Sequence, residues 1–226
     1  MSADLRLVVF DVDGTLVNSQ AHILVSMRHA LADFGVDAPS DQAILHGIGL
    51  SLPELMAQLV PETDDTTRAK LVARYKELSF ARHATAGSDA ESPFYPGMRD
   101  VLDQLRGQDE VLLATATGKS RRGMDRMISH HGLNGYFQST QVADNHPSKP
   151  HPSMLWTALA ETGVDAENAI MIGDTSYDMA MGKAAGMKTI GVGWGYHGSA
   201  QLDADTVVQS ANELWIALDE WMEAAT

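Results

Sequence analysis

The sequence lacks cysteine entirely, and it also lacks any uninterrupted apolar run of membrane length. Without cysteine the chain forms no disulfide bond and offers no thiolate to a metal, which fits a reducing compartment. The first apolar run, Leu5 to Phe10, is too short for a signal peptide or a membrane span. We therefore expect a cytoplasmic protein with no membrane partner.

Basic residues are also scarce, since 16 Lys and Arg stand against 30 Asp and Glu, for a formal net charge of −14. Nucleic acids and anionic membranes are bound mainly through Lys and Arg, so neither is expected as a partner. At 226 residues the chain can bury a sizeable core, as one large domain or as one domain carrying a smaller insert. A monomer or a homodimer is expected.

Residues 17–90 show the helical spacing of apolar side chains and no strand pattern. Three helices are predicted there, namely Ala21 to Phe34, one that follows Ser51, and Thr63 to His83. Ser51 and Glu54 have the spacing of a capping box, which favours a helix start at that point. We therefore predict an all-helical insert over 17–90, joined to the rest by a small, polar hinge from Ala84 to Ser92.

From Pro93 onward, predicted strands alternate with predicted helices. The later strands are expected at Glu110 to Ala116, Gln138 to Ala143, Ala169 to Gly173, Lys188 to Val192 and, at an edge, Thr206 to Val208. Together with a first strand at Leu5 to Phe10, this order indicates right-handed crossovers and a parallel sheet covered on both faces. The predicted fold class is α/β, a Rossmann-like doubly wound parallel sheet, with a core domain of 1–16 plus 91–226 and the helical insert of 17–90.

Two carboxylates follow the first predicted strand with one residue between them, Asp11 and Asp13. The alternation of a strand would place them on the same side. Two carboxylates at so short a distance are not both ionised unless a cation or a proton lies between them. An isolated Asp-x-Asp-Gly is also an ordinary polar turn. An EF-hand loop is excluded, because Gly14 comes too early and His22 stands where a glutamate is required.

The ends of the other predicted strands carry further candidate residues, and ligands of doubly wound sheets bind at these ends. The second strand runs into Thr117 and Gly118, where a helix opens whose free N–H groups favour an anion. The loop after the third strand holds Lys149 between prolines. The fourth strand ends at Asp174, and Asp178 follows one helical turn later.

Each of these signals also has an ordinary structural explanation. Thr117 or Asp174 could cap the helix that follows it, and Asp178 could complement the helix dipole. Lys149 could be a solvated loop lysine. Taken together, four carboxylates, a hydroxyl and a lysine at one rim of one sheet suit phosphoryl chemistry. In that chemistry carboxylate oxygens hold Mg²⁺, the metal bridges to phosphate oxygens, and a cation offsets the remaining charge.

This ordered set resembles the motifs of the haloacid dehalogenase superfamily, specifically its phosphatases with a helical C1-type cap inserted after the first motif. The matching residues are Asp11-Val12-Asp13-Gly14-Thr15-Leu16, Thr117 with Gly118, Lys149-Pro150, and Gly173-Asp174 with Asp178. The resemblance covers nearly the whole chain and is strongest to phosphoglycolate-phosphatase-like members. It implies a Mg²⁺-dependent phosphatase for a small phosphorylated metabolite, with the insert acting as a cap that closes over the site.

The resemblance also implies a role for each matching residue. Asp11 would attack phosphorus and become an aspartyl phosphate, while Asp13 would act first as general acid and then as general base. Asp11, Asp174 and the backbone carbonyl of Asp13 would hold Mg²⁺, with Asp178 supporting the metal shell. The transferring phosphoryl group would be bound by Thr117, Gly118 and Lys149.

Several other activities of such proteins remain to be weighed. Asp13 argues against dehalogenation, because a halide leaving group needs no proton. It also argues against an ion pump and against a phosphonoacetaldehyde hydrolase, although Lys70 and Lys76 of the insert offer a Schiff-base lysine. The alternatives left open are a phosphomutase of the β-phosphoglucomutase type, a pyrophosphatase, and a phosphate-sensing switch that does not turn over.

Substrate specificity is expected from the insert, where the sequence is less informative. Gly47 to Ser51 is the candidate specificity loop, with an ordinary turn between helices as the alternative. Arg82 is a candidate contact for an anionic substrate tail. The nine histidines show no zinc motif, and His130 and His131 point about 100° apart on a helix.

Overall fold

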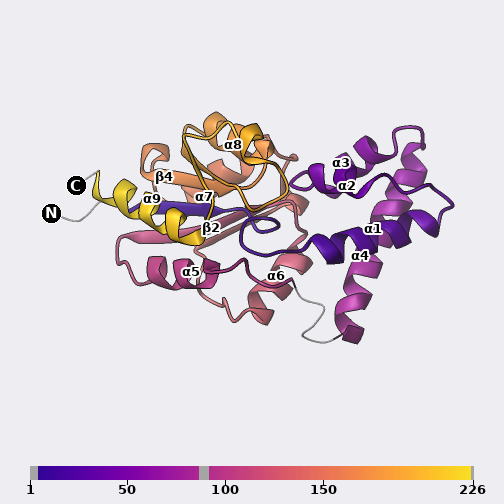
Figure 1. Cartoon of the computed structure of the whole chain (residues 1–226), viewed down its shortest axis with the longest axis horizontal. Coiled ribbons are helices and arrows are strands. Elements are labelled where there is room, and N and C mark those ends of the chain that lie inside the picture. Colours follow the sequence, from indigo (N-terminus) through magenta and orange to yellow (C-terminus); the bar gives the residue numbers. More distant parts are fainter. Residues whose placement is uncertain (1–4, 87–91, 225–226) are drawn as a thin grey trace.

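The computed structural model describes residues 5–86 and 92–224, the side chains of residues 82–86 excepted. Within it, six strands form one parallel sheet in the order β3-β2-β1-β4-β5-β6 (Figure 1). The strands are β1 Arg6–Phe10, β2 Val111–Thr117, β3 Ser139–Val142, β4 Ala169–Gly173, β5 Lys188–Val192 and β6 Thr206–Val208. The chain therefore has the predicted α/β, doubly wound fold class.

Strand β1 lies at the centre of this sheet, between β2 and β4. Phe10 at its end is in register with Thr115 of β2 and Ile172 of β4, so the three strands end close together. Every residue of β1 and β4 is buried. Both faces of the sheet are covered, which is why these strands, apart from Arg6, are continuously apolar rather than alternating.

Helices cover the two faces of the sheet and connect its strands. They are α5 Met98–Arg106, α6 Arg121–His130, α7 Ser153–Thr162, α8 Ser176–Ala184 and α9 Ala211–Glu223, with short 3₁₀ turns η2 Ala143–Asn145, η3 Ala166–Asn168 and η4 Ser199–Gln201. Val8 and Phe10 pack in one apolar cluster with α5, α6 and α9, whereas Leu7 and Val9 pack in another with α7 and α8. Successive side chains of β1 thus enter opposite layers, as the period of two requires.

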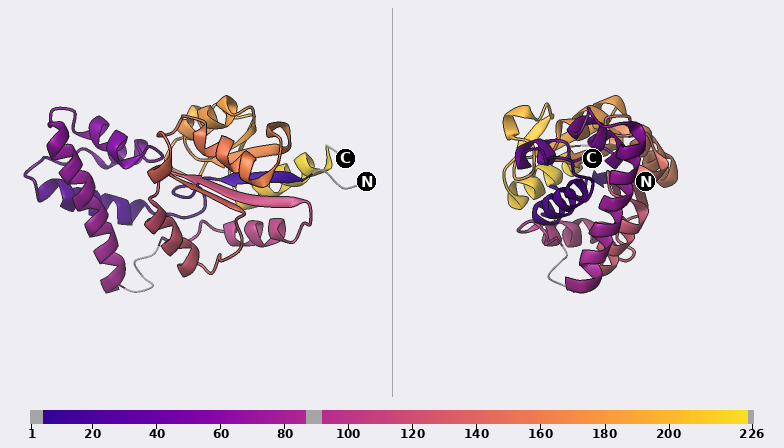
Figure 2. Two further views of the ribbon diagram at one scale, coloured as in Figure 1. Left: turned by 180° about the vertical axis from the view of Figure 1, so that it is seen from behind. Right: turned by 90° about the vertical axis from the view of Figure 1, so that its right-hand side faces the viewer.

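The insert forms a separate helical layer beyond the carboxyl ends of the strands (Figures 1 and 2). Its helices are α1 Gln20–Ala32, α2 Asp41–His46, α3 Leu52–Leu59 and α4 Asp65–Ala86. They share their own apolar cluster, in which Met27, Ile44, Met56 and Leu71 are fully buried. These four side chains come from four different helices, so the insert has a core of its own.

Two neighbouring connections join the insert to the sheet. Val17 and Phe94 form an isolated antiparallel bridge, and the backbone N–H of Asn18 donates to the carbonyl of Pro93 at 2.8 Å. The predicted hinge, Ala84 to Ser92, lies largely outside the described residues, although its first three residues continue α4. The exact division of the chain into 17–90 and the remainder stays a prediction.

Local predictions differ from the structure at a few places. The helix expected from Lys119 begins at Arg121, with Ser120 as its N-cap. Helix α2 was not expected, because only Ile44 of its six residues is buried and so short a segment shows no periodicity. The capping box predicted at Ser51 is wrong: its side chain makes no cap hydrogen bond, and its N–H donates at 2.7 Å to Ser148 Oγ of the core instead.

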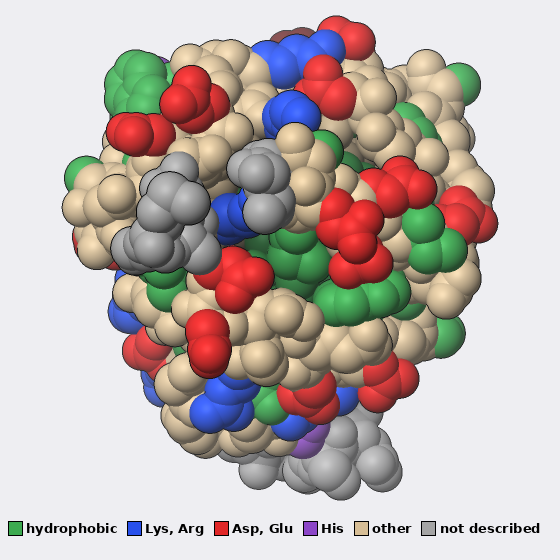
Figure 3. Space-filling model, turned by 90° about the vertical axis from the view of Figure 1, so that its left-hand side faces the viewer, with side chains coloured by type: hydrophobic (Ala, Val, Ile, Leu, Met, Phe, Trp, Pro, Cys, Tyr) green, Lys and Arg blue, Asp and Glu red, His purple; other side chains and the backbone are tan. Residues whose placement is uncertain are grey.

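The outer surface agrees with the acidic composition. At the end of the molecule opposite the insert, acidic side chains are interspersed with basic and apolar ones (Figure 3). None of the helices in the described part of the chain combines the length and the apolar character needed to cross a bilayer.

Candidate active site

Three buried carboxylates meet at the carboxyl ends of the central strands. Asp11 directly follows β1, Asp174 directly follows β4, and Asp178 lies in the first turn of α8. One oxygen of each lies within 4.8 Å of the others, and none of the three residues is more than 1% exposed. The adjacency of β1 and β4 brings these groups together, although more than 160 residues separate Asp11 from Asp174.

Lys149 supplies a positive charge to this cluster from the loop after β3. Its ammonium lies 2.8 Å from Asp11 Oδ1 and 2.6 Å from Asp178 Oδ1, and the residue is 1% exposed. With Asp174 included, three carboxylates face one ammonium, which leaves two formal negative charges when all are ionised. A buried excess of this kind is costly unless protons or a cation compensate for it.

The electrostatics of the cluster reflect this excess. Burial raises the pKa of the Asp11 carboxyl to about 7, with a further rise from Asp178 and an opposing effect of Lys149. Burial also raises the pKa of Asp174 well above its usual range, and the negative charges of Asp11 and Asp178 add to the rise. Burial alone would lower the pKa of Lys149, but Asp11 and Asp178 outweigh it and the pKa is raised.

The donor set fits a divalent cation bound by oxygen ligands. Asp11 Oδ2 is buried and has no hydrogen-bond partner among the described residues, so one lone-pair-bearing oxygen is left for a ligand. Asp174 is held in place from both sides, since its Oδ1 accepts from Thr15 Oγ1 at 3.0 Å and its Oδ2 accepts from the Tyr196 N–H at 2.7 Å. Hard cations such as Mg²⁺ prefer ligands of this type, oriented by such outer hydrogen bonds.

Asp178 has a structural function as well. Its Oδ2 accepts hydrogen bonds from the N–H and the hydroxyl of Thr175, at 3.0 and 2.6 Å, in a capping box at the start of α8. Its Oδ1 is bound to Lys149. Both the dipole interpretation and the supporting role at the site are therefore compatible with its position, whereas the N-cap of α8 is Thr175 rather than Asp174.

We expect the stabilisation by Mg²⁺ to increase with pH. Because the folded pKa of Asp11 is raised to about 7, the folded protein binds this proton more tightly than the unfolded chain. In the metal-free protein, the contribution of this group to the free energy of unfolding is thus fully present in acid. It is lost as the pH rises through 7. Thermal unfolding with Mg²⁺ and with EDTA should show a larger Mg²⁺-induced shift at pH 8 than at pH 5. Equal shifts at both pH values would contradict this.

Two glycines leave room for the Asp174 carboxylate. A Cβ at Gly14 would lie 2.2 Å from Asp174 Oδ2, and one at Gly195 would lie equally close. Gly14 also has φ +88°, a conformation that L side chains rarely adopt. Gly195 belongs to the Gly-rich loop after β5, and a side chain at either glycine would collide with Asp174.

Replacing Gly14 by alanine is therefore expected to weaken Mg²⁺ binding by about tenfold or more, since Asp174 must move. Gly163→Ala is a matched control, because Gly163 also has a positive φ but has open space where the Cβ would go. Both changes strain the backbone by about 1–3 kcal/mol. Calorimetric titration with Mg²⁺ should separate them, and equal affinities in the two variants would refute the steric argument.

The remaining predicted residues lie beside the cluster. Asp13 is bound to Lys119, with Oδ1 and Nζ 2.8 Å apart, and its side chain is not in the group that converges with Asp11. Thr117, at the end of β2, is fully buried and its Oγ1 accepts from the Lys119 N–H at 3.2 Å. Thr117 is not the N-cap of the next helix, because Ser120 is. Gly118 follows at the rim.

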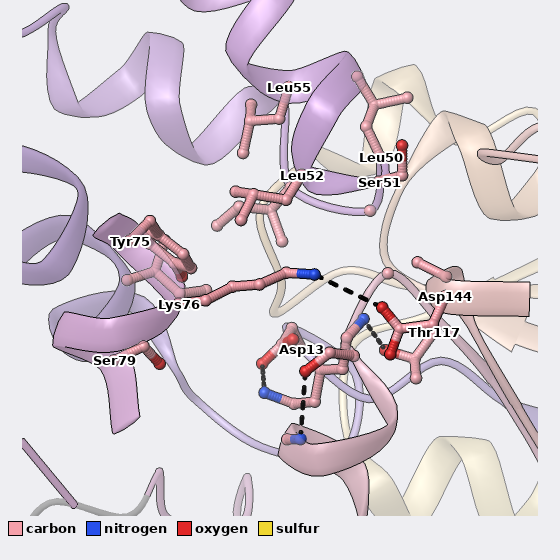
Figure 4. Close-up of a pocket in the computed structure, with 18 of the residues that line it drawn as sticks. Asp13, Leu50, Ser51, Leu52, Leu55, Tyr75, Lys76, Ser79, Thr117 and Asp144 are labelled. Atoms are coloured by element: carbon pink, nitrogen blue, oxygen red, sulfur yellow. Dashed lines mark hydrogen bonds and ion pairs between the residues drawn. The ribbon is translucent and has the colours of Figure 1, made fainter. Parts of the chain in front are cut away.

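A cavity of about 960 Å³ opens above these residues, between the core and the insert (Figure 4). Its floor includes Asp11, Asp13 and Thr117, and its roof comes from the predicted specificity loop, α3 and α4. The loop packs tightly on the core, since a Cβ at Gly118 would lie 2.7 Å from the carbonyl oxygen of Leu50. The loop 47–51 thus lines the cavity and is more than a turn between helices. The side chain of Arg82 lies outside the described residues.

Several site residues were not identified from the sequence. Thr15 and Tyr196 position Asp174, Lys119 pairs with Asp13, and Ser148 binds the backbone of Ser51. Lys119 and Ser148 stand next to predicted motif residues, and Thr15 belongs to the first motif, so adjacency to a motif was the available signal. Tyr196 gave no signal beyond its position after a Gly-rich loop.

Comparison with known proteins identifies the family to which the sequence is similar. The model of haloacid dehalogenase-like hydrolases matches residues 8–192. The probable phosphatase IndB of Dickeya dadantii is 36% identical over 200 residues, which cover 88% of this chain and 85% of that protein. The pyrophosphatase PpaX of Bacillus pumilus is 32% identical over 202 residues, with 88% of each chain covered. A phosphoglycolate phosphatase of Haemophilus influenzae is 28% identical over 201 residues, covering 87% and 89%.

Solved structures show the same fold. The crystal structure of a predicted phosphoglycolate phosphatase from Haemophilus somnus superposes with a TM-score of 0.83 at 20% sequence identity. The match covers 96% of this chain and all of that one. The sheet and the helical insert are therefore found together in this group of proteins.

Proposed function

Because this chain belongs to the haloacid dehalogenase-like hydrolase family, we propose that it is a Mg²⁺-dependent phosphatase that hydrolyses a small phosphomonoester through an aspartyl phosphate. Phosphatases among its relatives support the reaction class. The observation that carries the proposal is the buried cluster of Asp11, Asp174, Asp178 and Lys149, which combines a carboxylate with an unengaged oxygen and a compensating cation.

Asp11 is the proposed nucleophile. Lys149 holds its Oδ1 at 2.8 Å, which orients the carboxylate and favours its ionised form against the opposing effect of burial. Attack of an Asp11 oxygen on phosphorus forms an O–P bond as the ester O–P bond breaks, and the leaving alkoxide takes a proton from Asp13. In the second step Asp13 removes a proton from water, the water oxygen attacks phosphorus, and Asp11 is released together with phosphate.

Mg²⁺ would be held by Asp11, Asp174 and the backbone carbonyl of Asp13, with Asp178 keeping Lys149 and the start of α8 in place. Bound there, the cation would neutralise negative charge on the phosphate oxygens. The donor set leaves two uncompensated negative charges, which matches the charge of this ion.

Thr117, Gly118 and Lys149 are the proposed contacts of the phosphoryl group. The Thr117 hydroxyl is buried at the end of β2, and the backbone at Gly118 is hemmed in by Leu50 of the insert. A hydroxyl and backbone N–H groups held in fixed positions stabilise developing charge without reorganisation. The roof over the cavity would exclude bulk water from the phosphoryl group.

The test is phosphate release from p-nitrophenyl phosphate and from a panel that includes 2-phosphoglycolate, pyrophosphate and hexose phosphates. Activity should require Mg²⁺ and should disappear with EDTA. Activity that survives both EDTA and Asp11→Asn would overturn the proposal.

The alternatives predict different outcomes in the same assays. A pyrophosphatase, which the relationship to PpaX favours, would turn over pyrophosphate faster than any ester. A phosphomutase of the β-phosphoglucomutase type would isomerise a sugar phosphate faster than it releases phosphate. A phospho-switch would incorporate one phosphoryl group and stop.

The remaining expectations stay proposals. We place the protein in the cytoplasm on the absence of cysteine and propose a small phosphorylated metabolite as its partner, without nucleic acid or membrane. A monomer or homodimer is expected, which gel filtration with light scattering would distinguish.

A further inference from the structure

One lysine of the insert extends into the cavity above the proposed catalytic residues. Lys76 lies on α4, and its ammonium is 3.5 Å from Oδ1 of Asp144, in the 3₁₀ turn that follows β3. Figure 4 places this ammonium between Leu52 of the insert and Asp13 of the core. Lys76 and Asp144 therefore form an ion pair that bridges the insert and the core across the cavity.

This pair is longer and more exposed than the ion pairs of the proposed catalytic residues. The ammonium groups of Lys119 and Lys149 lie 2.8 Å from Asp13 and Asp11, respectively. The Lys76 pair is longer, and its side chains are 50% and 38% exposed. Exposed pairs of this kind contribute little net free energy, so Lys76 can exchange its partner at small cost.

Asp144 is the fixed member of the pair. Its Oδ2 accepts a hydrogen bond from the backbone N–H of Arg121 at 2.7 Å, at the start of α6. Lys76 contacts only the other oxygen, through a long and flexible side chain. On arrival of a substrate anion, the ammonium of Lys76 can move while Asp144 stays in place.

The position of Lys76 matches the leaving group of a substrate rather than its phosphoryl group. The phosphoryl group is assigned to Asp11 and Thr117 at the floor and to Lys149 beside Asp11, and the rest of the ester must occupy the space below the roof. The roof around Lys76 combines the apolar or aromatic Leu52, Leu55 and Tyr75 with the acidic Glu54 and Glu77. Among the described residues, Lys76 is the one Lys or Arg of the roof that lines the cavity, since Lys119, Arg122 and Arg126 belong to the core. The roof can therefore neutralise one added negative charge.

Resting on the proposed function, we propose that Lys76 is a specificity residue that binds a carboxylate on the leaving-group side of the substrate, with Asp144 as its partner in the free protein. The substrate class is then the phosphorylated carboxylic acids. A carboxylate carries the one charge that a single ammonium neutralises. The net charge of −14 repels such anions, so a local cation is needed to retain them.

The experiment compares Lys76→Met with Lys70→Met, a lysine on the same helix that does not line the cavity. Each is assayed with Mg²⁺ on two pairs of esters: 2-phosphoglycolate with 2-hydroxyethyl phosphate, and 3-phosphoglycerate with glycerol 1-phosphate. Lys76→Met should raise KM for a carboxylate member by about tenfold or more. KM for the member without a carboxylate should change by less than about twofold. The same limit applies to KM for every ester with Lys70→Met. Equal changes within each pair, or none, would overturn the inference.

Asp144→Asn tests the partner exchange. The amide oxygen can still accept from Arg121, but the competing charge is gone, so KM for the carboxylate ester should fall. In the Lys76→Met background the same change should have no effect, because there is no ammonium to release. An equal fall in both backgrounds would mean that Asp144 merely repels the substrate, and the proposed exchange would be wrong.

Failure of the inference and failure of the proposed function are distinguishable. If the unmodified protein releases no phosphate from any of these esters or from p-nitrophenyl phosphate, the proposed function fails. If it hydrolyses p-nitrophenyl phosphate but prefers the member of each pair that lacks a carboxylate, only the assignment of Lys76 fails.

Discussion

Asp11→Asn is expected to lower kcat by at least about 10³-fold while the protein stays folded. An amide oxygen is too weak a nucleophile to displace the alkoxide from phosphorus, so the covalent step is lost. Folding should be retained because asparagine has the same shape. It also avoids the cost of ionising a buried carboxyl whose pKa is raised to about 7. The measurement is phosphate release with Mg²⁺ at pH 8, alongside near-ultraviolet circular dichroism.

Asp125→Asn is the matched control, since it removes one exposed carboxylate from α6, 3.7 Å from Arg121. Its kcat should remain within about twofold of the unmodified value. Substantial turnover by the folded Asp11→Asn protein would mean that another group attacks phosphorus, and the assignment of Asp11 as nucleophile would be abandoned.

Lys149→Met is expected to destabilise the metal-free protein by about 3–5 kcal/mol. The change removes the ammonium that lies 2.8 Å from Asp11 and 2.6 Å from Asp178, which leaves two buried carboxylates without a cation. Urea unfolding in EDTA at pH 8 measures the loss. It should be smaller at pH 5, where Asp11 is protonated in the folded protein and only Asp178 loses its partner.

Lys183→Met provides the contrast, because it breaks an ion pair of similar length in solvent. Lys183 lies 2.8 Å from Asp203, but the side chains are 41% and 92% exposed. The expected loss is below about 1 kcal/mol. If the two variants unfold at the same urea concentration, burial is not what makes the Lys149 pairs strong, and the electrostatic account of the cluster is wrong.

These two variants separate two properties of one cluster. Asp11→Asn tests the nucleophile and keeps the ammonium of Lys149. Lys149→Met tests whether this ammonium is what allows the carboxylates to be buried. Mg²⁺ should partly restore the stability of Lys149→Met, because both cations act on the same carboxylates. It should not restore the turnover of Asp11→Asn.

Much of the molecule followed from local sequence patterns. Strands β1 and β4 were located because the apolar runs that end at Phe10 and Gly173 are continuous, as buried parallel strands require. The rim residues could be listed because such strands present their carboxyl ends on one side. The short helix α2 was missed, since so short a segment has no periodicity. The capping box at Ser51 was predicted wrongly, since a spacing of two residues does not reveal that Ser51 contacts Ser148 of the core.

The sequence by itself determined which residues stand at the ends of the strands, because strand and helix periods are local properties of the chain. Only the tertiary structure decided how they pair: Lys149 with Asp11 and Asp178, Lys119 with Asp13, and Lys76 with Asp144 across the cavity. Which charges meet depends on the order of strands in the sheet and on where the insert packs. Contacts between distant segments set both, and no short pattern encodes them.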